Sequence, residues 1–166
     1  MKFTELGLST STLSSIKKLG FITPTPIQAL AIPFLLDHEQ DLIGLASTGT
    51  GKTAAFGLPL IEKVDDSLSD TQAIILAPTR ELCMQITEDM KKFSIHRSGL
   101  NILAVYGGAN IVPQIKALKL GAQIVVATPG RLVDLIDRKV AKLENVRFVV
   151  LDEADEMLNM GFKDEI

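Results

Sequence analysis

The chain contains very little of the two residue types that most often hold zinc or form disulfides. Its 166 residues include one cysteine, Cys83, and two well-separated histidines, His38 and His96. A single cysteine excludes an internal disulfide and a cysteine-rich metal site. Two separated histidines argue against a zinc site as well. Cys83 itself is predicted to pack rather than react, because its helical position supplies no partner base.

Long apolar runs and an excess of positive charge are also missing. Residues 1–7 lack the continuous apolar stretch of a signal peptide, and no segment reaches membrane-spanning length. These absences predict a cytoplasmic protein with no membrane partner. The net charge is −3 and the pI is near 5.4. A protein held on nucleic acid mainly by bulk charge would be basic, so any such binding must use local N–H groups and a few placed basic side chains.

The chain is rich in apolar residues, at 46%, which suits one domain with a well-filled α/β core. Nearly continuous apolar runs, typical of strands covered on both faces, occupy residues 42–46, 73–77, 102–105, 123–127 and 147–151. Helical patterns follow them at residues 52–64, 80–93, 112–120 and 131–136, and two more precede them at 11–19 and 26–36. This alternation predicts a parallel sheet with right-handed crossovers. Residues 164–166 fall inside a predicted helix with no cap, which suggests a cut from a longer chain.

Residues 46–53, Ala-Ser-Thr-Gly-Thr-Gly-Lys-Thr, look like a turn that holds a polyphosphate. The loop's ligand-facing members are predicted to be Thr48, Gly49, Thr50, Gly51, Lys52 and Thr53. The two glycines let backbone N–H groups approach the phosphates. Lys52 brings a compact positive charge to the terminal phosphates, and the hydroxyl of Thr53 can ligate magnesium. An ordinary glycine-rich turn is the alternative.

An acidic motif follows the apolar run at residues 147–151. Asp152 is suited to hold magnesium, partly through water, and Glu153 to orient and deprotonate an attacking water. Together with the phosphate loop, Asp152-Glu153-Ala154-Asp155 resembles the signature of the DEAD-box ATP-dependent RNA helicases. The resemblance extends over essentially the whole chain and covers the first RecA-like domain only.

The resemblance implies a RecA-like P-loop NTPase: a three-layer α/β fold with a mainly parallel sheet flanked by helices. Residues 1–166 would be the helicase ATP-binding domain, with a Q-motif region at 1–29. The C-terminal part of that domain and the second RecA-like domain would be absent. ATP and Mg²⁺ are the implied cofactors. The full protein would couple ATP hydrolysis to RNA unwinding, whereas this fragment is expected to be a monomer that binds nucleotide weakly and unwinds nothing.

Residues 20–28 resemble the family's adenine-reading Q motif. The amide of Gln28 offers both a donor and an acceptor, as the adenine edge requires. Phe3 occupies the place of the ring that stacks on the base in the family. The alternative makes Gln28 an exposed helix residue and Phe3 a core residue.

The resemblance assigns RNA backbone contacts to three features that follow predicted strands: Pro78, Thr79 and Arg80; Gly107 and Gly108; and Thr128, Pro129, Gly130 and Arg131. Helix N-termini present unpaired N–H groups to phosphate, and arginine grips phosphate at two points. Parallel strands would align all three along one sheet edge. Such contacts carry no sequence code, and a preference for RNA over DNA would come from 2′-hydroxyl groups. Alternatively, Thr79 is only an N-cap, Arg80 a solvated charge and the glycine pair a tight turn.

Two other functions remain open. A phosphate-loop motor acting on DNA or protein is disfavoured by Gln28 and by the Thr-Pro-Gly-Arg run at 128–131. A non-catalytic RNA clamp is disfavoured by the intact Lys52 and Glu153. The first would respond equally to DNA and RNA. ATP turnover that survived Glu153→Gln would disprove the water-activating role of Glu153.

Overall fold

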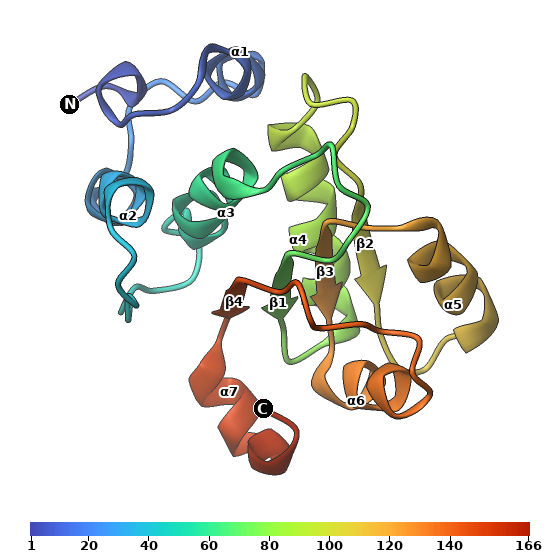
Figure 1. Ribbon diagram of the computed structural model, residues 1–166. Coiled ribbons are helices and arrows are strands. Elements are labelled where there is room, and N and C mark those ends of the chain that lie inside the picture. Colours follow the sequence, from blue (N-terminus) through green and yellow to red (C-terminus); the bar gives the residue numbers. More distant parts are fainter. The chain divides into compact units, whose positions relative to one another are not determined.

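The computed structural model describes residues 1–166 as two compact units. The first unit comprises Met1–Val64 and Asp89–Ser98, and the second comprises Asp65–Glu88 and Gly99–Ile166. Helix α4, Arg80–Phe93, contributes residues to both (Figure 1). None of the helices combines the length and apolar character needed to cross a membrane.

The first unit is helical. It contains the 3-10 turn η1 (Phe3–Glu5), α1 (Thr10–Lys18), α2 (Pro26–Asp37) and α3 (Lys52–Lys63), within about two residues of the predicted bounds. Local chemistry sets the helix starts. The Ser9 hydroxyl accepts the Thr12 N–H at 3.3 Å as the cap of α1, and Pro26 occupies the first position of α2, where its missing N–H leaves no bond unmade.

Two kinds of contact hold this unit together. Phe21 packs edge-to-face against Phe3 and Phe93, with ring centroids 5.7 and 5.8 Å apart. Such geometry suits the aromatic quadrupole. The Ser9 hydroxyl also donates to Glu62 at 2.8 Å, which ties the start of α1 to α3. The N-terminal segment is therefore packed into the unit that carries the phosphate loop.

The strand predicted at residues 42–46 is absent, which corrects the sequence interpretation. The segment has no regular secondary structure, and Ile43 and Leu45 are 90% and 93% exposed. A strand exists only where a neighbour accepts its backbone hydrogen bonds. The first unit contains no strand to do so. The run is apolar as a buried strand would be, but apolar composition alone does not provide a neighbouring strand to pair with.

The second unit contains a four-stranded parallel sheet. Its strands are β1 (Ala73–Leu76), β2 (Ile102–Val105), β3 (Ile124–Ala127) and β4 (Phe148–Leu151), in the order β2-β3-β1-β4. Ile75 of β1 lies opposite Val126 of β3 and Val150 of β4. All four match predicted apolar runs to within a residue at each end. Strand β4 forms one edge of the sheet, and Val149 on it is 63% exposed.

Helices cover both faces of this sheet (Figure 1). The helices that follow the strands are α4, α5 (Ile111–Leu120), α6 (Pro129–Asp137) and α7 (Ala154–Asn159), with the turn η2 (Phe162–Asp164) after them. On one face, Ile74 and Val125 pack with Leu135 of α6 and Met157 of α7. On the other, the Cys83 thiol of α4 donates to the Val126 carbonyl at 3.1 Å. The predicted α/β class is confirmed.

The last helix is shorter than predicted. Helix α7 ends at Asn159, and Gly161 has a positive φ of 89° before the single turn η2. Glycine adopts this left-handed conformation without a Cβ penalty, and so it commonly ends helices. Residues 164–166 therefore lie beyond the end of α7, with Asp164 closing the turn η2.

The end of α6 is held by a lysine in a left-handed conformation. Lys139 has φ +57°, its N–H donates to the Ile136 carbonyl at 2.8 Å, and the Val140 N–H donates to the Leu135 carbonyl at 2.9 Å. This pair of bonds is a Schellman motif, a position that favours glycine. We expect Lys139→Gly to raise the free energy of unfolding by about 1 kcal/mol in urea titration. Lys139→Ala keeps the Cβ, so an equal gain in that variant would contradict the explanation.

Candidate functional site

The phosphate-loop residues form an exposed turn that leads directly into α3. Gly49 and Gly51 both adopt the left-handed conformation, with φ +76° and +85°, and Gly51 is the residue before the helix. The Thr50 hydroxyl donates to the Ser47 carbonyl at 2.7 Å and closes the turn. Lys52 and Thr53 begin α3, whose first N–H groups have no partner inside the helix. This arrangement of turn and helix start suits an anion.

Gln28 braces this turn from α2. Its side chain is only 3% exposed, and its amide nitrogen donates to the Gly51 carbonyl at 3.2 Å. Its amide oxygen accepts the Thr25 N–H at 3.0 Å, one half of a capping box. The alternative of an exposed helix residue is therefore wrong. The Thr25-x-x-Gln28 spacing carried the capping signal in the sequence, but the link to Gly51 is a tertiary contact that no spacing reveals.

Phe3 lies in the core of the first unit. It is buried and contacts Phe21 edge-to-face. The structure thus bears out the core alternative for this ring. Its contact with a base stays a prediction.

The acidic residues follow β4 immediately. Asp152 is 8% exposed, and its N–H continues the sheet by donating to the Leu76 carbonyl at 3.0 Å. Glu153 has φ +55° and ψ +49°, a left-handed conformation that is rare for a non-glycine residue, and it precedes α7. Strain of this kind costs about 1–3 kcal/mol and concentrates at functional positions. No three His, Cys, Asp or Glu side chains gather into a metal-holding group.

The three features predicted to bind RNA share the carboxyl edge of the sheet with these acids, because they follow β1, β2 and β3. Pro78 is buried, and the Thr79 hydroxyl accepts the Leu82 N–H at 3.2 Å, so Thr79 does cap α4. The Arg80 guanidinium is exposed and stands 5.0 Å above the Tyr106 ring. Gly108, with φ +74°, is exposed.

The turn after β3 contacts the turn after β2. The Thr128 hydroxyl accepts the Gly107 N–H at 3.2 Å. Pro129 is the buried first residue of α6, and Gly130 is exposed. Arg131 donates to the Gln114 side chain at 2.9 Å and to the Ala109 carbonyl at 3.0 Å, so part of its guanidinium is occupied by the protein. Sequence reasoning did not identify Gln114. The sequence feature that could have identified it is a polar residue on the core-facing side of the predicted helix at 112–120.

Lys52 and Thr53 belong to the first unit, and Asp152, Glu153 and the predicted RNA-binding residues belong to the second. The structure brings Gln28 and Gly51 together in the first unit. In the second, it groups the acids with the three predicted RNA features.

The Cys83 thiol is buried in α4, and desolvation raises its pKa to about 12 from an ordinary value of 9.0. Below pH 9 the thiol is neutral in both the folded and the unfolded state. Above pH 9 only the unfolded state ionises, so stability is lost as pH rises from 9 toward 12. We expect Cys83→Ala to show a shallower decline of the unfolding midpoint over pH 8–10. Thiol reagent should label wild type only as fast as it unfolds, and rapid labelling of the native state would contradict the burial.

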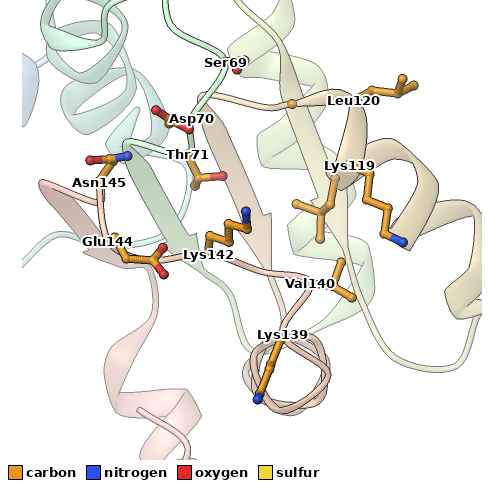
Figure 2. A pocket seen from close by; sticks show the side chains of 12 residues that line it. Ser69, Asp70, Thr71, Lys119, Leu120, Lys139, Val140, Lys142, Glu144 and Asn145 are labelled. Atoms are coloured by element: carbon orange, nitrogen blue, oxygen red, sulfur yellow. The ribbon is translucent and has the colours of Figure 1, made fainter.

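A hollow of about 400 Å³ lies at the opposite, amino-terminal edge of the same sheet. Figure 2 shows Thr71, which precedes β1, and Asn145, which precedes β4, on its wall. Its charged lining is mixed, with Lys119, Lys139, Lys142, Asp70 and Glu144. None of the predicted site residues lines it, and its charges favour neither an anion nor a cation.

Comparisons with known proteins agree on one family. The model of the DEAD/DEAH box helicases matches residues 25–166. The DEAD-box ATP-dependent RNA helicase CshA of Streptococcus pneumoniae is 54% identical over 166 residues, which is 100% of this chain and 31% of that protein. The ATP-dependent RNA helicase CshA of Listeria monocytogenes is 53% identical over 165 residues, 99% of this chain and 31% of its own length.

Solved structures give the same result. A DEAD box protein from Methanococcus jannaschii superimposes with a TM-score of 0.91 at 47% identity, covering 99% of this chain and 45% of that one. The RNA helicase Prp28 from Chaetomium thermophilum, bound to ADP, gives 0.89 at 43% identity, with 99% and 41% covered. The present chain spans about a third of the length of the curated relatives that it matches.

Proposed function

Because this chain belongs to the DEAD/DEAH box helicase family, we propose that residues 1–166 are the ATP-binding part of an ATP-dependent RNA helicase. The full-length protein would couple ATP hydrolysis to local separation of RNA strands or remodelling of RNA–protein complexes. The proposal rests most on one observation: the carboxyl edge of the sheet collects Asp152, the strained Glu153 and three turns suited to phosphate. Open parallel sheets bind ligands at that edge.

The phosphate loop is assigned to the nucleotide phosphates. Gly49 has open space where a side chain would stand, so the backbone there can be approached closely, whereas the Cβ position of Gly51 is filled by the Gln28 amide. The first N–H groups of α3 add a partial positive charge. Lys52 would contact the terminal phosphates. Thr48 and Thr50 would line the turn. Gln28 has one amide hydrogen and one oxygen lone pair beyond the bonds described above, so it retains the capacity to bind an adenine edge. Phe3 would stack on the base.

The acids are assigned to hydrolysis. Asp152 offers a carboxylate oxygen to Mg²⁺, a hard cation that keeps most of its water and needs few protein ligands. The Thr53 hydroxyl, at the start of α3, is proposed as a magnesium ligand from its place directly after Lys52. Such an ion would neutralise charge on the transferring phosphate. Glu153 would hold the attacking water and take its proton. Its left-handed backbone lies between the end of β4 and the start of α7.

The three turns are assigned to the RNA backbone. Pro78, Thr79 and Arg80 would contact one phosphate group, the Gly107–Gly108 turn another, and the start of α6 from Thr128 through Arg131 a third. Binding would be independent of sequence because phosphate and sugar carry no code. This local scheme suits a chain with net charge −3.

We propose that a second RecA-like domain, outside residues 1–166, completes the enzyme. The share of the relatives' length that this chain spans, 31%, supports that view. In comparable enzymes, arginines supplied to the transferring phosphate are worth ~10³–10⁵ in rate. Residues 1–166 alone would therefore bind adenine nucleotide weakly, turn it over negligibly and unwind nothing.

The test uses the full-length protein. ATP turnover is measured with no nucleic acid, with single-stranded RNA and with DNA of the same sequence, and unwinding is followed on a short RNA duplex. Stimulation by RNA with little by DNA, and ATP-dependent strand separation, would support the proposal. Equal stimulation by DNA points to a DNA motor. RNA binding without turnover points to a clamp.

A further inference from the structure

A hydrogen-bonded network links the turns after β2 and β3. We call it the Gln114 clasp, and it consists of Tyr106, Ala109, Gln114 and Arg131. Gln114 projects from α5 and is only 8% exposed. Its oxygen accepts the Tyr106 N–H at 3.2 Å and an Arg131 N–H at 2.9 Å, and its nitrogen donates to the Tyr106 carbonyl at 3.2 Å. Arg131 also donates to the Ala109 carbonyl at 3.0 Å.

The clasp is specific in its chemistry. The primary amide of Gln114 carries both the acceptor and the donor that pair with the N–H and the carbonyl of Tyr106, as a neighbouring strand would. The planar guanidinium of Arg131 then reaches Gln114 and Ala109 with two parallel groups, an arrangement that lysine cannot copy. Both ends of the segment 106–109 are therefore held, and Gly107 and Gly108 lie between the two points of attachment.

The clasp extends to the start of α4, which follows β1, through an aromatic ring. The Arg80 guanidinium stands 5.0 Å above the Tyr106 ring, within the range of a cation–π contact. Gln114 pairs with both the N–H and the carbonyl of Tyr106, and so it holds the stretch of backbone that carries this ring. The orientation of Arg80 thus depends on a residue of another helix.

We propose that Gln114 and Arg131 are positioning residues for RNA: the clasp orders the Gly107–Gly108 turn and sets the Tyr106 ring beneath Arg80. Arg131 acts through this network and does not itself bind phosphate. This inference rests on the proposed RNA binding and revises one part of it. The Gly107 N–H already donates to the Thr128 hydroxyl, so it is not free for phosphate. The Gly108 backbone and the Arg80 side chain are among the groups that remain for phosphate at this edge.

The experiment measures the affinity of the full-length protein for a fluorescent single-stranded RNA at fixed salt. The variants are Gln114→Met, Arg131→Met, Arg131→Lys and the double variant Gln114→Met/Arg131→Met. Each single change is expected to weaken binding about tenfold. Arg131→Lys should lose as much as Arg131→Met although it keeps the charge, and the double variant should lose no more than either single one, because residues of one network are not additive.

Two further variants separate positioning from general damage. Lys116→Met removes an exposed positive charge from the same helix outside the clasp and should change affinity less than twofold. Tyr106→Leu leaves the backbone network intact but removes the ring, and it should weaken binding as the clasp variants do, whereas Tyr106→Phe should not. Thermal unfolding identifies any variant that fails to fold. If a clasp variant fails to fold, the comparison of Tyr106→Leu with Tyr106→Phe provides the test.

Normal RNA affinity in Arg131→Lys, together with a loss in Arg131→Met, would overturn the inference. That result would mean that only the positive charge at position 131 matters, as expected for a direct contact with phosphate. Losses that multiply in the double variant would overturn it equally. If the wild-type full-length protein bound no RNA, the proposed function would fail and the clasp would be left without a ligand to position.

Discussion

Replacing Glu153 with glutamine is expected to lower the RNA-stimulated ATP turnover of the full-length protein by about 10²–10⁴-fold, the usual contribution of a general base. Glutamine keeps the size and a hydrogen-bonding oxygen but cannot take a proton at neutral pH. Nucleotide affinity should remain within a few-fold, because the change does not touch the phosphate loop. Turnover is measured under saturating ATP and RNA.

The same position offers a second and opposite readout. Glu153 holds φ +55°, which costs a side-chain-bearing residue about 1–2 kcal/mol. Glu153→Gly should therefore raise the free energy of unfolding by about 1 kcal/mol while it abolishes turnover. Glu156→Gln, an exposed carboxylate of α7 with ordinary helical backbone, serves as the control and should change neither. Turnover within about threefold of wild type in Glu153→Gln would remove the residue from the catalytic assignment.

Gly51→Ala is expected to weaken ADP binding by about 10–100-fold, measured by calorimetry. Gly51 holds φ +85°, and a Cβ at this position would overlap the amide nitrogen of Gln28. Alanine is strained in this conformation by about 1–2 kcal/mol, and the overlap adds to that strain. The phosphate loop should relax to another conformation. ADP binding would then have to restore the original conformation, and the free energy of that change would be lost from the affinity. A difference of 1.4 kcal/mol corresponds to tenfold in affinity.

Gly20→Ala is the matched control. Gly20 has nearly the same backbone conformation, φ +82°, but open space where its Cβ would stand. It lies after α1, outside the phosphate loop. This variant should lose about 1 kcal/mol of stability and keep its affinity for ADP. Equal losses of affinity in the two variants would show that backbone strain in general, and not the shape of the loop beside Gln28, governs nucleotide binding.

Much of the second unit was predictable because local patterns and tertiary structure agreed there. The runs at 73–77, 102–105, 123–127 and 147–151 became strands because each is apolar on both faces and is followed by a helix. Strand β4 stays partly exposed because it lies at the edge of the sheet. The grouping of the three turns proposed to bind RNA was predictable for a related reason. In a parallel sheet, whatever follows the strands gathers at one edge.

Other features depended on contacts that no local pattern encodes. The run at 42–46 has the composition of a strand but no strand beside it in its unit. Glutamate is a poor residue for a left-handed backbone, so nothing in the sequence predicted the conformation of Glu153. Arg131 was interpreted as a phosphate ligand from its position in a helix start, yet its guanidinium contacts Gln114 and Ala109.

The sequence by itself determined the family, the fold class and the helix start at Pro26, and it supplied the residues that are proposed for the site. These follow from residue type and spacing along the chain, which local sterics and hydrogen bonding convert directly into structure. Only the tertiary structure decided which polar groups are already satisfied: Gln28 by Gly51 and Thr25, and Arg131 by Gln114 and Ala109. A hydrogen bond between residues far apart in sequence forms only when the donor–acceptor distance is right to within a few tenths of an ångström. The order of residues along the chain does not give that distance.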